Sequence, residues 1–160
     1  MGYTHYWTFR SPAKGQAKSV EKAYQQAIKE CSKIAKAYQK DALGYERLSG
    51  YTAHAPSWSY GGLHINGKSE LAHENFTMRE HFKQNLGWRN NFCKTAQKPY
   101  DVVVVACLIV LKHRLGKYFE VESDGLQHDW QTGLELAKQV LKLKKLSIPA
   151  SISVTRERVA

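Results

Sequence analysis

Basic side chains interleaved with aromatic ones make residues 80–98 a candidate for ligand binding, although a solvated basic loop has the same composition. This connection is longer than compact domains usually carry without a function of its own. Its candidate ligand-binding residues are Trp88, Arg89, Lys94, Thr95 and Lys98. Cationic groups bind phosphate, aromatic rings stack on bases, and a helix starting at Pro99 adds free N–H donors. The pattern therefore predicts a site for an anionic, base-bearing ligand.

A second candidate site is the polar face of a predicted sheet. Residues 3–10 alternate as a half-buried strand does, with Trp7 and Phe9 on the core side. Strands are also expected at 63–67, 73–79 and 118–122. If all four turn their apolar sides toward the helices, the open face carries Thr4, Tyr6, Thr8, His64, Asn66, His73, Asn75, Thr77, Tyr118, Glu120 and Glu122.

On this open face, Tyr6, His73 and Asn75 are the candidate ligand-binding residues. Aromatic stacking and several fixed hydrogen bonds suit a base or a ribose. The carboxylates of Glu120 and Glu122 disfavour a long phosphate backbone there. The face is therefore better suited to a small nucleotide-type molecule than to a polymer.

Other residues with reactive side chains favour structural roles. Asp101 stands where a first-turn carboxylate caps its own helix, and Ser123-Asp124-Gly125 is typical of a turn after a strand. His5 lies on the core side of its strand. The seven histidines form no His-Glu-x-x-His pattern, so we predict no metal and no cofactor. Cys93 has no signature of a cysteine hydrolase.

The elements that position these residues predict an α+β fold. The expected order is strand, helix, strand, strand, helix, strand, helix, with helices near 19–40, 99–116 and 130–144. This order matches the ferredoxin-like split βαβ plan (βαββαβ) with an additional C-terminal helix. The four valines after Asp101 would also suit a strand, but the length of the apolar run and Pro99 favour a helix. We expect one domain over residues 1–146 and a basic tail, loose or forming a lone strand, over 147–160.

Composition narrows the class of protein. The 160 residues include 24 Lys and Arg against 14 Asp and Glu, a net charge of +10 that attracts nucleic acid, nucleotides or acidic protein surfaces. The longest apolar run, 102–111, is about half the length of a membrane-spanning helix. The opening residues lack a signal-peptide pattern. Three cysteines without a pairing framework fit a reducing cytoplasm.

Four short motifs carry a resemblance to one known family. Met1-Gly2-Tyr3-Thr4-His5-Tyr6-Trp7, Phe92-Cys93-Lys94-Thr95, Lys98-Pro99-Tyr100-Asp101 and Ser123-Asp124-Gly125 resemble an uncharacterised family of small phage- and prophage-encoded proteins. The resemblance covers roughly residues 1–10 and 62–130. Small phage accessory proteins without catalytic motifs commonly act by stoichiometric binding. The resemblance therefore implies a binder that interferes with host physiology or defence in the bacterial cytoplasm.

We expect a non-catalytic accessory protein that sequesters an anionic nucleotide-type ligand, such as a defence second messenger. Three alternatives stay open. The chain could be an inhibitor that docks on a host defence protein through its basic surface, with Trp58 and Trp88 as anchors. It could also be a nucleic-acid-binding protein or a nucleotide hydrolase. The open sheet face and the basic connection each offer a surface for pairing subunits in a homo-oligomer.

Overall fold

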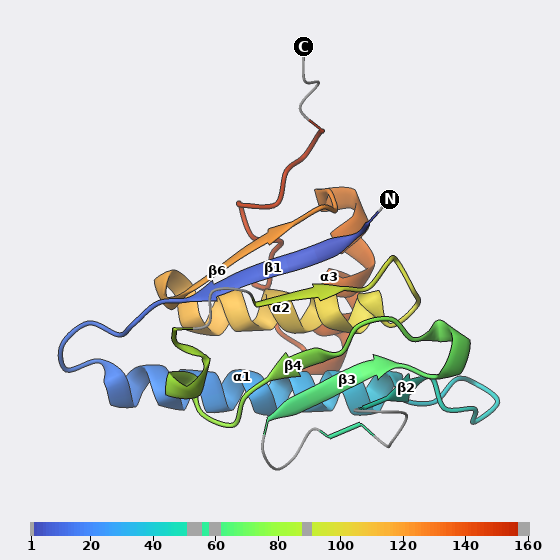
Figure 1. Cartoon of the computed structure of the whole chain (residues 1–160), viewed down its shortest axis with the longest axis horizontal. Coiled ribbons are helices and arrows are strands. Elements are labelled where there is room, and N and C mark those ends of the chain that lie inside the picture. The colour runs from blue at the N-terminus through green and yellow to red at the C-terminus, as the bar shows by residue number, and fades with distance from the viewer. Residues whose placement is uncertain (1, 51–55, 58–61, 88–90, 157–160) are drawn as a thin grey trace.

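The computed structural model describes residues 2–50, 56–57, 62–87 and 91–156, which form an α+β structure (Figure 1). The strands are β1 (Thr4–Phe9), β2 (Leu48–Ser49), β3 (Leu63–Gly67), β4 (Phe76–Met78), β5 (Asn91–Lys94) and β6 (Phe119–Ser123). The helices are α1 (Ala17–Tyr38), α2 (Asp101–Leu115) and α3 (Gln127–Leu141), with short 3-10 helices at Ser69–Leu71, Phe82–Asn85 and Gly116–Tyr118. The predicted α+β class and the additional C-terminal helix are confirmed.

The described strands form two antiparallel sheets of three strands, in the orders β5-β1-β6 and β2-β3-β4. The first strand lies beside the last, and β3 and β4 pair as a hairpin between the first two helices. Both features are consistent with a ferredoxin-like arrangement. One feature differs from the predicted order, because β5, rather than a strand of the hairpin, pairs with the other side of β1.

The strand pattern predicted for residues 3–10 is confirmed in β1. Tyr3, His5, Trp7 and Phe9 are buried, whereas Tyr6 is 43% exposed. Trp7 contacts Phe76 of β4 edge-to-face, so the buried side of β1 also packs against the second sheet. The two sides of β1 therefore have the environments that alternation of polar and apolar residues predicts, except at Thr4, which is expected on the open face but is buried.

The valine-rich segment forms α2, as predicted, and it lies at the centre of the core. Residues 103–111 of this helix are all buried, which is expected for a helix that is apolar on every side. It packs against α1 and α3, and the helices lie behind the strands in Figure 1. The amphipathic α1 buries one face, including Tyr24, Cys31 and Ile34, and turns the other outward. None of the described helices is long and apolar enough to cross a membrane.

Two segments differ from the expected elements. The connection expected over 80–98 contains β5, whose four residues pair with β1 from Thr4↔Lys94 to Trp7↔Asn91. The strand expected over 73–79 is limited to Phe76–Met78, so His73 and Asn75 precede it.

At the C-terminal end, Ile152 is buried, Ser151 Oγ donates to the carbonyl of Val121, and Gln127 N–H donates to the carbonyl of Ser153. These bonds hold residues 151–153 against β6 and the start of α3.

Candidate functional site

The motifs that stand far apart in the sequence meet in one buried hydrogen-bond network. His5 of β1 is fully buried, and its Nε2 lies 2.7 Å from Oδ1 of Asp101, the first residue of α2. The same oxygen accepts a 2.6 Å hydrogen bond from the hydroxyl of Thr95. On the other side of the ring, His5 Nδ1 lies 2.8 Å from the hydroxyl of Ser123 at the end of β6. Each of the four short motifs thus contributes one of these side chains.

Counting protons in this network assigns the tautomer of His5. A hydroxyl has one proton and two lone pairs. Ser123 Oγ accepts from the Gly125 N–H (2.9 Å) and from the indole N–H of Trp130 (3.3 Å). Its proton therefore points at His5 Nδ1, and the N–H of the ring lies on Nε2, where it donates to Asp101 Oδ1. Each hydrogen bond of the network then joins one donor to one acceptor, as a buried polar cluster requires.

The order Ser123, His5, Asp101 resembles the nucleophile, base and carboxylate of a hydrolase triad. Two observations disfavour attack by Ser123 in this arrangement. Both lone pairs of its oxygen already receive N–H donors, and the His5 ring has no exposed surface. The network is therefore better suited to hold β1, β6 and α2 in register than to generate a nucleophile.

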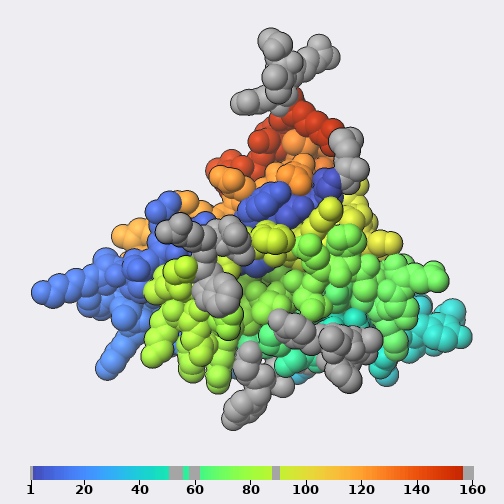
Figure 2. All heavy atoms as spheres, in the orientation of Figure 1, coloured from blue at the N-terminus to red at the C-terminus, as the bar shows by residue number. Residues whose placement is uncertain are grey.

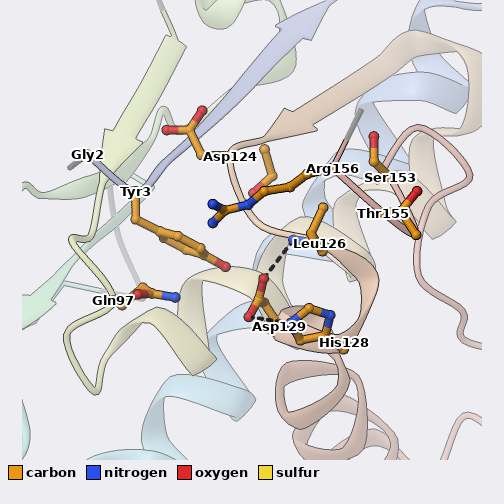
Figure 3. Close-up of a pocket in the computed structure, with 11 residues that line it drawn as sticks. Gly2, Tyr3, Gln97, Asp124, Leu126, His128, Asp129, Ser153, Thr155 and Arg156 are labelled. Atoms are coloured by element: carbon orange, nitrogen blue, oxygen red, sulfur yellow. Dashed lines mark hydrogen bonds and ion pairs between the residues drawn. The ribbon is translucent and has the colours of Figure 1, made fainter. Parts of the chain in front are cut away.

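A cavity of about 770 Å³ lies beside this network (Figure 3). Its lining comes from the start of β1, the end of β6, the start of α3, the turn at Gln97 and the C-terminal segment. The lining residues are Gly2, Tyr3, Gln97, Ser123, Asp124, Leu126, His128, Asp129, Ser153, Thr155 and Arg156. A volume of this size lies within the range of small-molecule binding sites, and almost every lining side chain can form hydrogen bonds. Ser123 links the cavity to the buried network.

The two carboxylates of the cavity have hydrogen-bond partners within the protein, whereas its guanidinium has no ion-pair partner among the described residues. Asp124 Oδ2 accepts a 3.0 Å hydrogen bond from the Thr4 N–H, and Asp129 Oδ2 accepts one of 2.8 Å from the Leu126 N–H at the start of α3. Asp129 Oδ1 also lies 3.2 Å from His128 Nε2. The Arg156 guanidinium forms no ion pair with another described residue. It is therefore a cation available to a ligand.

The wall of the cavity also holds an unpaired hydroxyl. The Tyr3 oxygen is buried and lacks a hydrogen-bond partner of normal geometry among the described residues, although Ser123 lies close by. Burial, and then the nearby carboxylates of Asp101 and Asp129, raise the pKa of Tyr3 well above its ordinary value, so the hydroxyl keeps its proton. Gly125 makes room for it, since a Cβ there would lie 2.2 Å from the Tyr3 oxygen.

A strained turn delivers Gln97 to the cavity. Ala96 and Gln97 both have positive φ angles, 51° and 55°, and the Lys98 N–H donates to the Thr95 carbonyl at 3.0 Å. Two positive φ angles define a type I′ turn, which normally uses Asn-Gly. Residues with side chains in this conformation cost free energy and are enriched at functional sites. The turn also places the Thr95 hydroxyl where it donates to Asp101 Oδ1.

The residues predicted from the basic connection are not all brought together. Thr95 is buried and its hydroxyl is committed to Asp101. The Lys94 side chain passes beside Gly2, at the rim of the cavity, while Lys98 Nζ donates to the Glu70 carbonyl at 3.1 Å. Trp88, Arg89 and the anchor Trp58 lie outside the described residues. Among the described members of this set, Lys94 is therefore a cation whose side chain lies beside a residue of the cavity lining.

The predicted open face exists on the β5-β1-β6 sheet. Tyr6 lies opposite Phe92 of β5 and Glu122 of β6, and both Tyr6 and Phe92 (47%) are exposed. In Figure 2 the blue side chains of β1 reach the surface between the orange β6 and the yellow-green β5. Glu120, on the same side, pairs with Arg10 at 2.8 Å. The face is therefore aromatic at its centre and acidic along β6.

Three other residues predicted for the open face do not lie exposed on this sheet. His73 is exposed, and its Nδ1 lies 2.7 Å from the Lys94 carbonyl. Asn75 Oδ1 accepts a 2.9 Å hydrogen bond from Asn66, which is buried. Thr4 is buried as well. Tyr6 and His73 thus stay on the surface, but neither residue lines the cavity.

Several residues that line the cavity are not among the predicted ligand-binding residues. The sequence places Tyr3 on the core side of its strand and Arg156 in the tail, and it predicts no role for Asp129. The sequence does contain a usable signal, because Asp124 and Asp129 both stand just before the predicted start of the last helix near residue 130. Among the described residues, no group of three or more His, Cys, Asp and Glu side chains is placed to hold a metal ion. Burial raises the pKa of the Cys93 thiol to about 12, which keeps it protonated.

No protein-family model, curated protein or solved structure matches this chain.

Proposed function

We propose that this protein is a binding protein that sequesters an anionic, nucleotide-type small molecule in the cavity beside Ser123. The single observation that carries the proposal is the cavity itself. It is about 770 Å³ in volume, is lined mostly by residues whose side chains can form hydrogen bonds, and contains the guanidinium of Arg156, which forms no ion pair with another described residue.

The side chains of the cavity suit the separate parts of a nucleotide. Arg156 presents a planar fork of N–H donors that matches a phosphate, and Lys94 adds a cation near Gly2 at the rim. A carboxylate such as Asp124 can accept hydrogen bonds from ribose hydroxyls, as acidic residues do in dinucleotide sites. Gln97 can both donate to and accept from a base. The net charge of +10 favours the approach of an anion.

Binding without turnover is supported by the state of Ser123. Its lone pairs receive the Gly125 and Trp130 N–H groups, so the hydroxyl is held as a donor to His5. The resemblance of the four motifs to phage- and prophage-encoded proteins adds a biological setting. In that setting the ligand is a signalling nucleotide of host defence, captured in the host cytoplasm.

A ligand screen by thermal shift tests the proposal. The probes are AMP, cyclic AMP, ADP-ribose and a cyclic dinucleotide. A ligand at 100 times its Kd stabilises the folded state by about 2.7 kcal/mol. Arg156→Gln should remove most of this gain, whereas Lys144→Gln, which removes the same charge from an exposed position outside the cavity, should retain it. A screen in which no nucleotide raises the Tm would overturn the proposal.

A nucleotide hydrolase is the second candidate, favoured by the 2.8 Å and 2.7 Å contacts of His5 with Ser123 and Asp101. Mass spectrometry of ligand recovered from the protein separates the two functions. Sequestration predicts that the recovered ligand is intact. Hydrolysis predicts products that accumulate with the wild-type protein and disappear with Ser123→Ala.

A further inference from the structure

Five lysines form a straight row along the exposed side of α1, and none of them lines the cavity. They are Lys18, Lys22, Lys29, Lys33 and Lys36, and all five are exposed. Their spacings of 4, 7, 4 and 3 residues place them within about 60° of arc, because a helix turns 100° per residue. At 1.5 Å per residue the row is about 27 Å long.

No described carboxylate neutralises this row. The two acidic residues of α1 are committed elsewhere, because Glu30 is buried in a bidentate pair with Arg114 and Glu21 is bound by His81 and by the Phe82 N–H. None of the five lysines forms an ion pair within the part of the chain that the structure describes. Like charges three or four residues apart repel one another, so the row destabilises the isolated helix. A linear polyanion would remove that repulsion.

We propose that the lysine row of α1 binds the phosphate backbone of double-stranded DNA without sequence preference. Cations at regular intervals along a straight line match a polymer of evenly spaced phosphates, and phosphate contacts of this kind carry no base readout. In the widest gap of the row, between Lys22 and Lys29, the exposed side chains are those of Gln25 and Gln26, which are uncharged.

Three features separate duplex DNA from other polyanions. The row contains no exposed aromatic residue on which single-stranded bases would stack. The apolar face of α1 is buried in the core through Val20, Ala27 and Ile34, so it is not available for insertion into a lipid surface. The exposed side of a helix fits the wide major groove of B-form DNA, whereas the major groove of A-form RNA is deep and narrow.

Salt dependence measures how many lysines contact phosphate. The experiment follows fluorescence anisotropy of a labelled 24-base-pair duplex of arbitrary sequence at 50–200 mM NaCl. Five contacts predict a slope of about −4.5 for log Kobs against log salt, or about a 500-fold loss of affinity over this range. Lys29→Gln combined with Lys33→Gln should reduce the slope to about −2.7, a loss of about 40-fold. The matched control combines Lys144→Gln and Lys145→Gln, two exposed lysines outside the row, and should keep the wild-type slope.

The control also separates the row from net charge, since both double variants remove two charges. Equal slopes for the two variants would overturn the proposal, as would tighter binding to duplex RNA or to anionic vesicles than to the DNA. Circular dichroism and Tm measurements establish that each variant is folded. Because α1 does not line the cavity, nucleotide binding by Lys29→Gln and Lys33→Gln should be unchanged, and the two proposals fail independently.

Discussion

Removing the hydroxyl of Tyr3 should stabilise the ligand-free protein, which is unusual for a change at a buried residue. Tyr3→Phe keeps the ring and its edge-to-face contact with His5, at a centroid distance of 5.2 Å, and deletes only the oxygen. That oxygen is buried without a partner of normal geometry among the described residues. A buried polar group without a hydrogen bond costs about 1–3 kcal/mol. Because polar neighbours surround this one, we expect a gain of about 1 kcal/mol, or about 2–4 °C in Tm.

Tyr100→Phe is the matched control, because it makes the same chemical change at a buried tyrosine whose hydroxyl is paired. The Tyr100 hydroxyl donates to the Glu74 carbonyl at 2.6 Å. Its loss should lower the free energy of unfolding by about 1 kcal/mol. Urea denaturation of both variants gives the two values directly. The reasoning is refuted if Tyr3→Phe loses stability to the same extent as Tyr100→Phe, since the Tyr3 hydroxyl would then have a partner.

Three further predictions concern the same region and the core. Gly125→Ala should lower the free energy of unfolding by about 1–3 kcal/mol, because the new Cβ would lie 2.2 Å from the Tyr3 oxygen; Tyr3→Phe should restore part of this loss in a double-mutant cycle. Burial raises the pKa of Tyr3, Tyr24 and Tyr100, so above pH 10 the unfolded chain releases protons that the folded chain keeps. The contribution of these tyrosines to the free energy of unfolding should therefore be fully present below pH 10 and should fall as the pH rises further. Denaturation midpoints at pH 8, 10 and 11 check the sign. Cys31 and Cys93 should resist Ellman's reagent at pH 8 until the protein unfolds, because burial raises the pKa of both thiols, and rapid labelling of the native protein would contradict this.

Local sequence pattern was sufficient for most of the secondary structure. Alternation over residues 3–10 predicted which side of β1 is buried, and helical spacing predicted α1 and α3 to within a few residues. The valine-rich run was ambiguous by composition, but its length and its proline indicated α2. In each case, buried residues recur along the element with the period of a strand or a helix. A short stretch of sequence is therefore enough to predict the type of element and its buried side.

The network and the cavity were decided only by the tertiary structure. β5 has four residues and little alternation, and its strand geometry comes from pairing with β1. The sequence predicts a ligand contact for Thr95 and a helix cap for Asp101. In the structure both side chains belong to the network around His5, which is 90 residues from Thr95 and 96 residues from Asp101 along the chain. The cavity needs Tyr3 and Arg156, at opposite ends of the chain, to meet. Contacts across such separations leave no periodic trace in the sequence, because they depend on how complete elements pack rather than on which residues are neighbours.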